Sequence, residues 1–224
     1  MVHLHIEHLV GLCVTRLDTI HTAREHALKI SRSLIQQCAR TIRAAHRGED
    51  GHAATLLAEA ATTATELRTA VADQPVLMGA GYLQDALKEY AEAALVYAFL
   101  TDQPAPTADA LGVDPAAFLN GLAEAASELR RAILDRLRRD DLAESERLLA
   151  TMDEVYSLLV TVDYPDAVTG GLRRTTDALR AVLERTRGDL TTALRQQRLM
   201  QQLARLDPDG LPSGAPLPDL DGAE

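Results

Sequence analysis

The sequence contains few aromatic residues and no tryptophan, and Phe, Tyr and Trp together make up 3% of its 224 residues. Runs of β-branched residues are also scarce, whereas Ala, Leu, Glu and Arg are abundant, and this composition favours helix over sheet. With 46% hydrophobic and 25% charged residues, the chain can bury a core. No stretch approaches the roughly 18 consecutive apolar residues that a membrane-spanning helix needs. We therefore expect an all-α protein without a membrane span.

Cysteine is almost absent, since Cys13 and Cys38 are the only two. Two cysteines imply no disulfide framework and are compatible with a reducing compartment. Residues 1–17 are apolar enough to suggest a signal peptide, but histidines and a glutamate interrupt them and no basic segment precedes them. We expect a cytoplasmic protein.

Several kinds of catalytic site are missing from the sequence. All seven histidines lie at or before His52, and the only Glu-x-x-His motif begins at Glu49, so the paired motifs of a di-iron bundle are absent. There is no glycine-rich phosphate loop, nucleophile elbow or paired C-x-x-C motif. These absences exclude the corresponding enzyme classes.

Lysine is scarce as well, so nearly all of the basic charge is arginine, whose planar guanidinium suits phosphate. An arginine-rich genome would produce the same bias. The formal net charge is −10, and part of it comes from acidic residues gathered after position 206. Composition therefore leaves nucleic-acid binding open.

Apolar periodicity, interrupted by Gly and Pro, predicts about seven helices in one all-helical domain over residues 1–206. Residues 207–224 are rich in Pro, Gly and Asp and predict a disordered acidic tail. The predicted helices cover residues 18–47, 52–72, 76–100, 107–111, 114–139, 140–162 and 170–206.

Two of these helices carry acidic residues on otherwise apolar faces. Glu89 and Glu92 share a face with Asp85 in the third helix, and Glu124 and Glu128 share a face in the fifth. Antiparallel packing of the two helices would bring the four glutamates together. An oxygen-only cluster without histidine suits Mg²⁺ or Mn²⁺ over Zn²⁺ and could activate water on a phosphodiester. From spacing alone, such pairs also occur on solvated surfaces.

A basic stripe follows the first helix at a period close to 3.6 residues. This stripe is either solvated surface or a track for the phosphates of a nucleic-acid strand. Because aromatic residues are scarce, contacts would be made mainly to the backbone and not by base stacking. The stripe consists of Lys29, Arg32, Arg40, Arg43 and Arg47.

Taken together, these segments resemble the translin family, and its Trax (translin-associated factor X) branch more than translin itself. The resemblance extends from about Ile20 to Leu203. Residues 87–93 resemble the Trax-type motif Q-E-Y-V-E-A, and residues 121–129 resemble G-V-A-D-L-T-G-E-L. Further similarity lies in residues 24–32, 40–47, 163–165 and 172–179.

The resemblance implies an all-helical subunit that assembles into a closed, octamer-like barrel, binds single-stranded RNA or DNA, and carries a Mg²⁺-dependent endoribonuclease site. By position, Glu89 and Glu92 match both acids of the first motif, and Glu128 matches the glutamate of the second. Glu124 stands where Trax has Asp, which keeps the charge but lengthens the side chain.

The leading hypothesis is a homo-oligomeric endoribonuclease for single-stranded RNA, in which the four glutamates hold Mg²⁺ or Mn²⁺ and the basic stripe positions the strand. The first alternative is a single-stranded RNA- or DNA-binding protein without catalysis. The second is a helical scaffold with solvated acid pairs. In each case we expect self-association, because Ala- and Leu-rich helices leave apolar strips that one subunit cannot cover.

Overall fold

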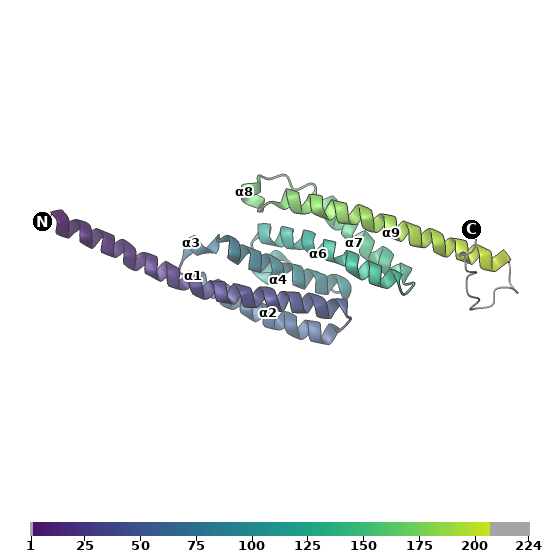
Figure 1. Cartoon of the computed structure of the whole chain (residues 1–224), viewed down its shortest axis with the longest axis horizontal. Helices are drawn as coiled ribbons and strands as arrows, with labels where there is room; N and C mark the ends of the chain where they lie inside the picture. The colour runs from purple at the N-terminus through teal and green to yellow at the C-terminus, as the bar shows by residue number, and fades with distance from the viewer. Residues whose placement is uncertain (1, 207–224) are drawn as a thin grey trace, which may run out of the picture.

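The computed structural model describes residues 2–206, and every regular element in this range is a helix (Figure 1). The predicted acidic tail, residues 207–224, lies outside the described residues. The all-α prediction is confirmed for the described part of the chain. The helices are α1 (Val2–His46), α2 (Asp50–Val71), α3 (Pro75–Met78), α4 (Gly81–Leu100), α5 (Ala108–Leu111), α6 (Pro115–Leu137), α7 (Leu142–Leu159), α8 (Asp166–Thr169) and α9 (Leu172–Leu206).

Helix boundaries follow local side-chain chemistry. The Thr107 hydroxyl accepts a hydrogen bond from the Ala110 N–H and caps α5. Pro115 occupies the first turn of α6, where its missing N–H costs nothing. After α1, Gly48 takes a φ of 72°, a conformation that glycine adopts without a Cβ clash. The predicted breaks at Gly and Pro are therefore correct.

The predicted number of helices is wrong, because residues 2–206 form nine helices and not seven. The segment expected as one helix over residues 76–100 is interrupted at Gly79 and Ala80, where the flanking glycines weaken helix formation. The short α8 was not expected. Helix α1 begins at Val2 and not at residue 18.

The long helices form two groups that meet along α4 and α6 (Figure 1). Helices α1, α2 and α4 pack together on one side, and α6, α7 and α9 on the other. Each group has its own apolar cluster, one including Leu34, Leu67 and Leu83, the other including Leu129 and Leu183. The α4–α6 contact is where the acidic faces meet.

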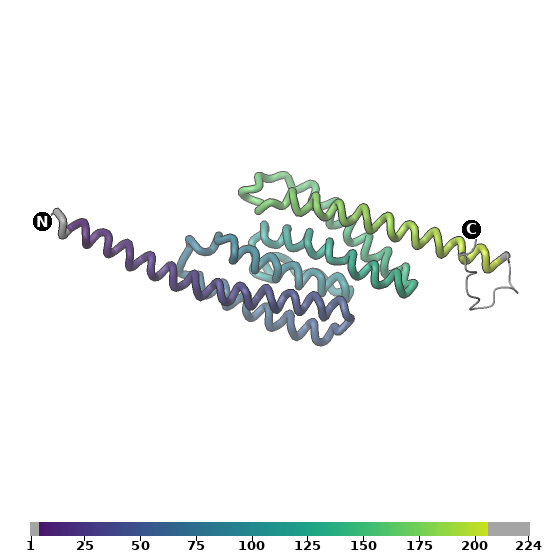
Figure 2. The backbone as a smooth tube through the Cα atoms, in the orientation of Figure 1, coloured from purple at the N-terminus to yellow at the C-terminus, as the bar shows by residue number. Residues whose placement is uncertain are grey.

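Helices α4 and α6 run in the same direction, which corrects the predicted antiparallel packing (Figure 2). Near the start of both, Gln84 Nε2 donates to Asp114 Oδ2 at 2.7 Å, and further along both, Lys88 pairs with Glu124. Residues 101–114 carry the chain back between them and make this direction possible. The acidic faces still meet, because parallel packing places Glu89 and Glu92 of α4 at the same level along the bundle as Glu124 of α6.

The first part of α1 projects beyond the bundle (Figure 2). One helical face, with steps of alternately four and three residues, is buried from Ala27 to Ala45. Beyond the exposed Arg24, the same register continues toward the N-terminus as an apolar strip. We call this strip the α1 seam; it consists of Ile6, Val10, Cys13, Leu17 and the half-buried Ile20. No helix of residues 2–206 is long and apolar enough to cross a membrane.

Candidate metal and nucleic-acid site

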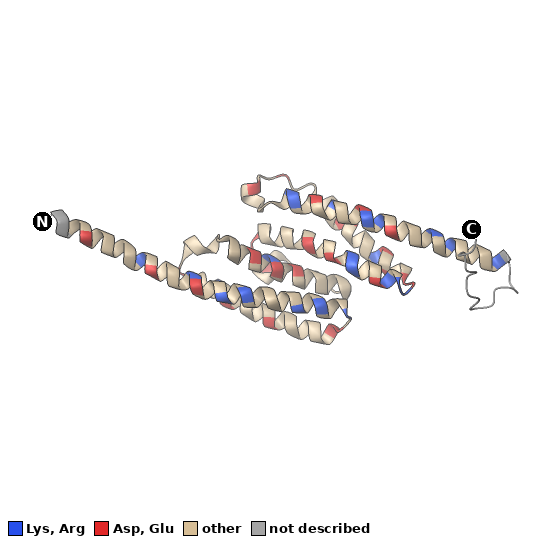
Figure 3. Ribbon diagram, in the orientation of Figure 1, with Lys and Arg blue, Asp and Glu red and all other residues tan. Residues whose placement is uncertain are grey.

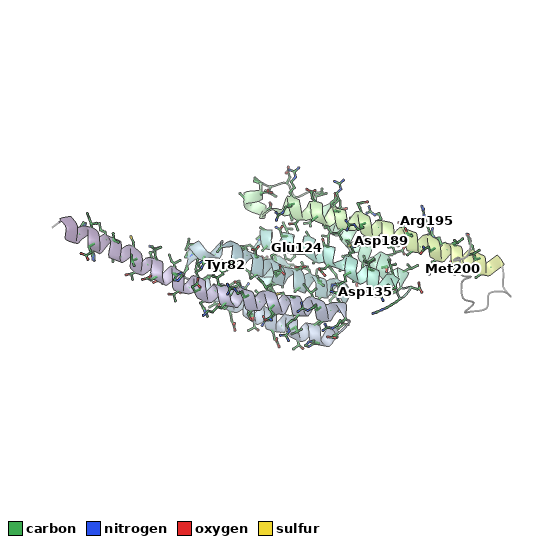
Figure 4. All side chains as sticks on the ribbon, viewed as in Figure 1. Tyr82, Glu124, Asp135, Asp189, Arg195 and Met200 are labelled. Carbon is green, nitrogen blue, oxygen red and sulfur yellow. The ribbon has the colours of Figure 1, made fainter. Side chains whose placement is uncertain are left out.

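Three glutamates from α4 and α6 form a carboxylate cluster. One carboxylate oxygen from each of Glu89, Glu92 and Glu124 lies within 4.8 Å of the others. Figure 4 labels Glu124 on the middle of α6, next to α4. Asp85, on the same face of α4, is exposed and outside the cluster. Two helices that are distant in sequence thus deliver three acids to one point.

Gly121 permits the close approach of α6 to α4. A Cβ at this position would lie 2.8 Å from the Lys88 carbonyl oxygen and 3.1 Å from both the Ala91 Cβ and the Glu92 nitrogen. Backbone atoms cannot move aside as the end of a flexible side chain can. Glycine is therefore required here for Glu124 to reach the acids of α4.

Glu92 is the most buried acid of the cluster, with 8% of its surface exposed. Burial, the largest cause, and the charges of Glu89, Glu124 and Glu128 together raise its pKa to about 8. Burial also raises the pKa of Glu89, against the lowering effect of Lys88. Negative charge at this point is thus incompletely compensated by the protein.

Glu128 lies apart from the three clustered acids and contacts α1. Its Oε2 is 3.1 Å from Nε2 of His46, a side chain that is only 1% exposed. The hydrogen bond from His46 lowers the pKa of Glu128 and outweighs its burial. His46 was not predicted as a site residue, since nothing in its spacing distinguishes it from other residues of the first helix.

Lys88 is a second site residue that the sequence analysis did not identify. Its Nζ lies 2.7 Å and 2.8 Å from the two carboxylate oxygens of Glu124 and 3.6 Å from Glu89 Oε1. Burial lowers its pKa, but the hydrogen bond to Glu124 and the surrounding negative charges more than compensate, so the pKa is raised. Lys88 is therefore an ammonium ion at the edge of the cluster.

The basic stripe is fully on the surface of α1, and Figure 3 shows basic positions along α1, which packs against α4 with its acidic positions. Arg47 is bound by Glu49, at 2.6 Å. Among the described residues, the other members have no ion-pair partner: Lys29, Arg32, Arg40 and Arg43. They are free to contact phosphates.

The donor set of the cluster fits a hard divalent cation. It offers carboxylate oxygens only, and burial, together with the neighbouring negative charges, raises the pKa of its most buried member, Glu92, to about 8. Mg²⁺ and Mn²⁺ prefer such oxygen ligands. Glu89, Glu92 and Glu124 are the residues that could hold the ion.

Comparison with known proteins places this site in context. No family model matches the sequence. The crystal structure of AfC3PO is 32% identical, with a TM-score of 0.73 over 85% of this chain and 98% of that chain. The chain belongs to the C3PO family. The structure of AfC3PO in complex with duplex RNA agrees equally well, with 31% identity and a TM-score of 0.72 over 88% of this chain and 98% of that chain.

Two further proteins are similar to this C3PO-family chain. An uncharacterized protein of Methanocaldococcus jannaschii is 31% identical over 186 residues, which are 83% of this chain and 82% of the relative. The structure of apo-NeC3PO has a TM-score of 0.71 over 83% of this chain and 96% of that chain, but at 18% identity it supports the fold alone. The translin-type fold is thus confirmed, whereas the Trax branch stays a prediction.

Proposed function

We propose that this C3PO-family chain is a Trax-like, metal-dependent endoribonuclease that cleaves single-stranded RNA. The observation that carries the proposal is the meeting of Glu89, Glu92 and Glu124, within 4.8 Å, at the contact of α4 and α6. Burying acids together is costly unless they are compensated. A divalent cation would provide that compensation.

The four acids would have two kinds of role in this chemistry. Bound Mg²⁺ or Mn²⁺ would supply an activated water and neutralise charge that develops on the phosphate. Glu89, Glu92 and Glu124 would hold the ion, and Glu92 would release its proton on doing so. Glu128, kept ionised by His46, would accept a hydrogen bond from water or from the strand at the edge of the cluster.

The unpaired stripe on α1 would position the RNA. Its members can contact phosphates without first breaking an ion pair, and backbone contacts need no base stacking. AfC3PO has been solved with duplex RNA, which supports RNA as the ligand class. The preference for single strands rests on the resemblance to Trax. The same resemblance includes single-stranded DNA as a second ligand.

Self-association completes the proposal. The exposed α1 seam supports a homo-oligomer, because an apolar strip of this length is unfavourable in water. The octamer in particular rests on the family resemblance. Surrounding a strand with several subunits would multiply weak backbone contacts.

The decisive experiment compares cleavage of labelled single-stranded RNA and of a duplex of the same sequence, with Mg²⁺ or with EDTA. We expect Mg²⁺-dependent cleavage of the single strand that Glu89→Gln or Glu128→Gln abolishes while RNA binding and helicity persist. Glu59→Gln, a change at an exposed glutamate of α2, is the matched control and should leave cleavage intact. Undiminished cleavage by Glu89→Gln would refute the catalytic role of the cluster.

A second candidate is a nucleic-acid-binding protein without catalysis. It is favoured by Lys88, which already compensates part of the negative charge of the cluster. In this case RNA would bind, but neither the parent chain nor Lys88→Gln would cleave it at any Mg²⁺ concentration.

A further inference from the structure

Lys88 lies beside two of the carboxylates that would hold a metal ion. Its Nζ contacts both carboxylate oxygens of Glu124 and lies 3.6 Å from Glu89 Oε1. The side chains of Lys88 and Glu124 are 21% and 32% exposed. The pair is therefore screened by water less than an ion pair on the open surface.

Glu124 cannot serve two cations equally well. Glu124 Oε1 accepts a hydrogen bond from Lys88, and Oε2 lies 2.7 Å from the same ammonium, whereas Mg²⁺ requires ligand oxygens at about 2.0–2.1 Å in a strict octahedral arrangement. An ammonium ion a few ångströms from a divalent cation also repels it strongly where screening is weak. The long, flexible stem of lysine allows the ammonium to move away without a backbone change.

We propose that Lys88 is the resident counterion of the carboxylate cluster, and that it must leave Glu124 before a divalent cation can be held by all three glutamates. This inference rests on the proposed function. It makes Lys88 the residue that sets the affinity of the site: the lysine compensates part of the negative charge without metal and weakens metal binding.

The Trax-type motifs that the chain resembles lack this pair. In the Trax-type motifs, the positions of Lys88 and Glu124 are Gln and Asp, which cannot form this ion pair. The longer glutamate and the lysine contact each other directly, at 2.7 Å. The double variant Lys88→Gln/Glu124→Asp would remove the pair while retaining the acid.

The test measures Mn²⁺ binding to the full chain by isothermal titration calorimetry, without RNA. We expect Lys88→Gln to bind Mn²⁺ about tenfold more tightly or better, because the repulsive charge is gone. Lys88→Arg retains the charge and should stay within about threefold of the parent. Arg195→Gln, which removes one positive charge from an exposed position of α9, is the control and should not change the affinity.

Glu92→Gln identifies the cluster as the site, because Mn²⁺ binding to the cluster should be lost in this variant. Thermal unfolding without metal verifies that each variant folds. If Lys88→Gln binds Mn²⁺ no more tightly than the parent while Glu92→Gln abolishes binding, the role of Lys88 is refuted and the metal site stands. If no variant, the double variant included, shows saturable binding that Glu92→Gln removes, the metal site itself is refuted, together with the proposed function.

Discussion

Glu92 illustrates how one buried carboxyl links the stability of this protein to pH. In the folded chain its pKa is about 8, well above its ordinary value near 4.5. Between these two values the folded state holds a proton that the unfolded state has lost. The contribution of Glu92 to the free energy of unfolding is therefore most favourable below pH 4.5 and declines as the pH rises toward 8.

Replacing Glu92 with Gln should remove that dependence. The amide imitates the protonated carboxyl, so without metal the variant should be more stable than the parent at pH 8, by on the order of 4 kcal/mol, and differ from it by less than about 1 kcal/mol at pH 5. Urea denaturation in EDTA at both pH values measures the difference. A parent whose free energy of unfolding is the same at pH 5 and pH 8 would contradict this account of Glu92.

At the scale of the element, the close contact of α4 and α6 depends on Gly121. In Gly121→Ala the new methyl would meet the Lys88 carbonyl oxygen at 2.8 Å, so the helices must separate. We expect a loss of about 1–3 kcal/mol in unfolding free energy, with weaker Mn²⁺ binding. Gly188→Ala in α9 is the control: its Cβ meets nothing within 4 Å, and the better helix former should stabilise by roughly 0.5–1 kcal/mol. Equal stability of the two variants would exclude a special role for Gly121.

The exposed stripe of α1 makes its own prediction. Arg40→Ala/Arg43→Ala should weaken the binding of single-stranded RNA and reduce its salt dependence, because each lost phosphate contact lowers the slope by roughly 0.7. Fluorescence anisotropy across a salt series measures both. Arg47→Ala should have less effect, since Arg47 is already paired with Glu49. An unchanged slope would identify the stripe as ordinary solvated surface.

At the scale of the whole molecule, the α1 seam predicts self-association. Val10→Glu/Leu17→Glu should dissociate the assembly in light scattering without loss of helicity, because both side chains are exposed in the single chain. Thr15→Glu, at an exposed position of α1 outside the seam, should leave the assembly unchanged. A parent chain that is monomeric at micromolar concentration would contradict the prediction.

Periodicity and breaking residues were sufficient to predict most of the long helices and the acidic faces, because these depend on neighbours in sequence, but they missed α8 and the break between α3 and α4. They could not predict which side chains of different helices come into contact. The direction of α6 relative to α4 depends on the path of residues 101–114, which can join helices in either sense. The contact of His46 with Glu128 joins residues 82 positions apart, and Lys88 becomes a counterion only once α6 is in place.

Cys38, a completely buried residue of α1, is a chemical reporter close to the carboxylate cluster. Burial raises the pKa of its thiol to about 12, and the charges of Glu89 and Glu92 contribute to the increase. Alkylating reagents attack the thiolate, so they can modify Cys38 only when α1 opens away from α4. The rate of that modification therefore measures how often α1 opens away from α4 near Glu89 and Glu92. A cation held by Glu89 and Glu124 stabilises the folded chain against openings that also separate α4 from α6, so it should slow the modification that occurs through them, and the occupancy of the site can be followed without RNA and without turnover.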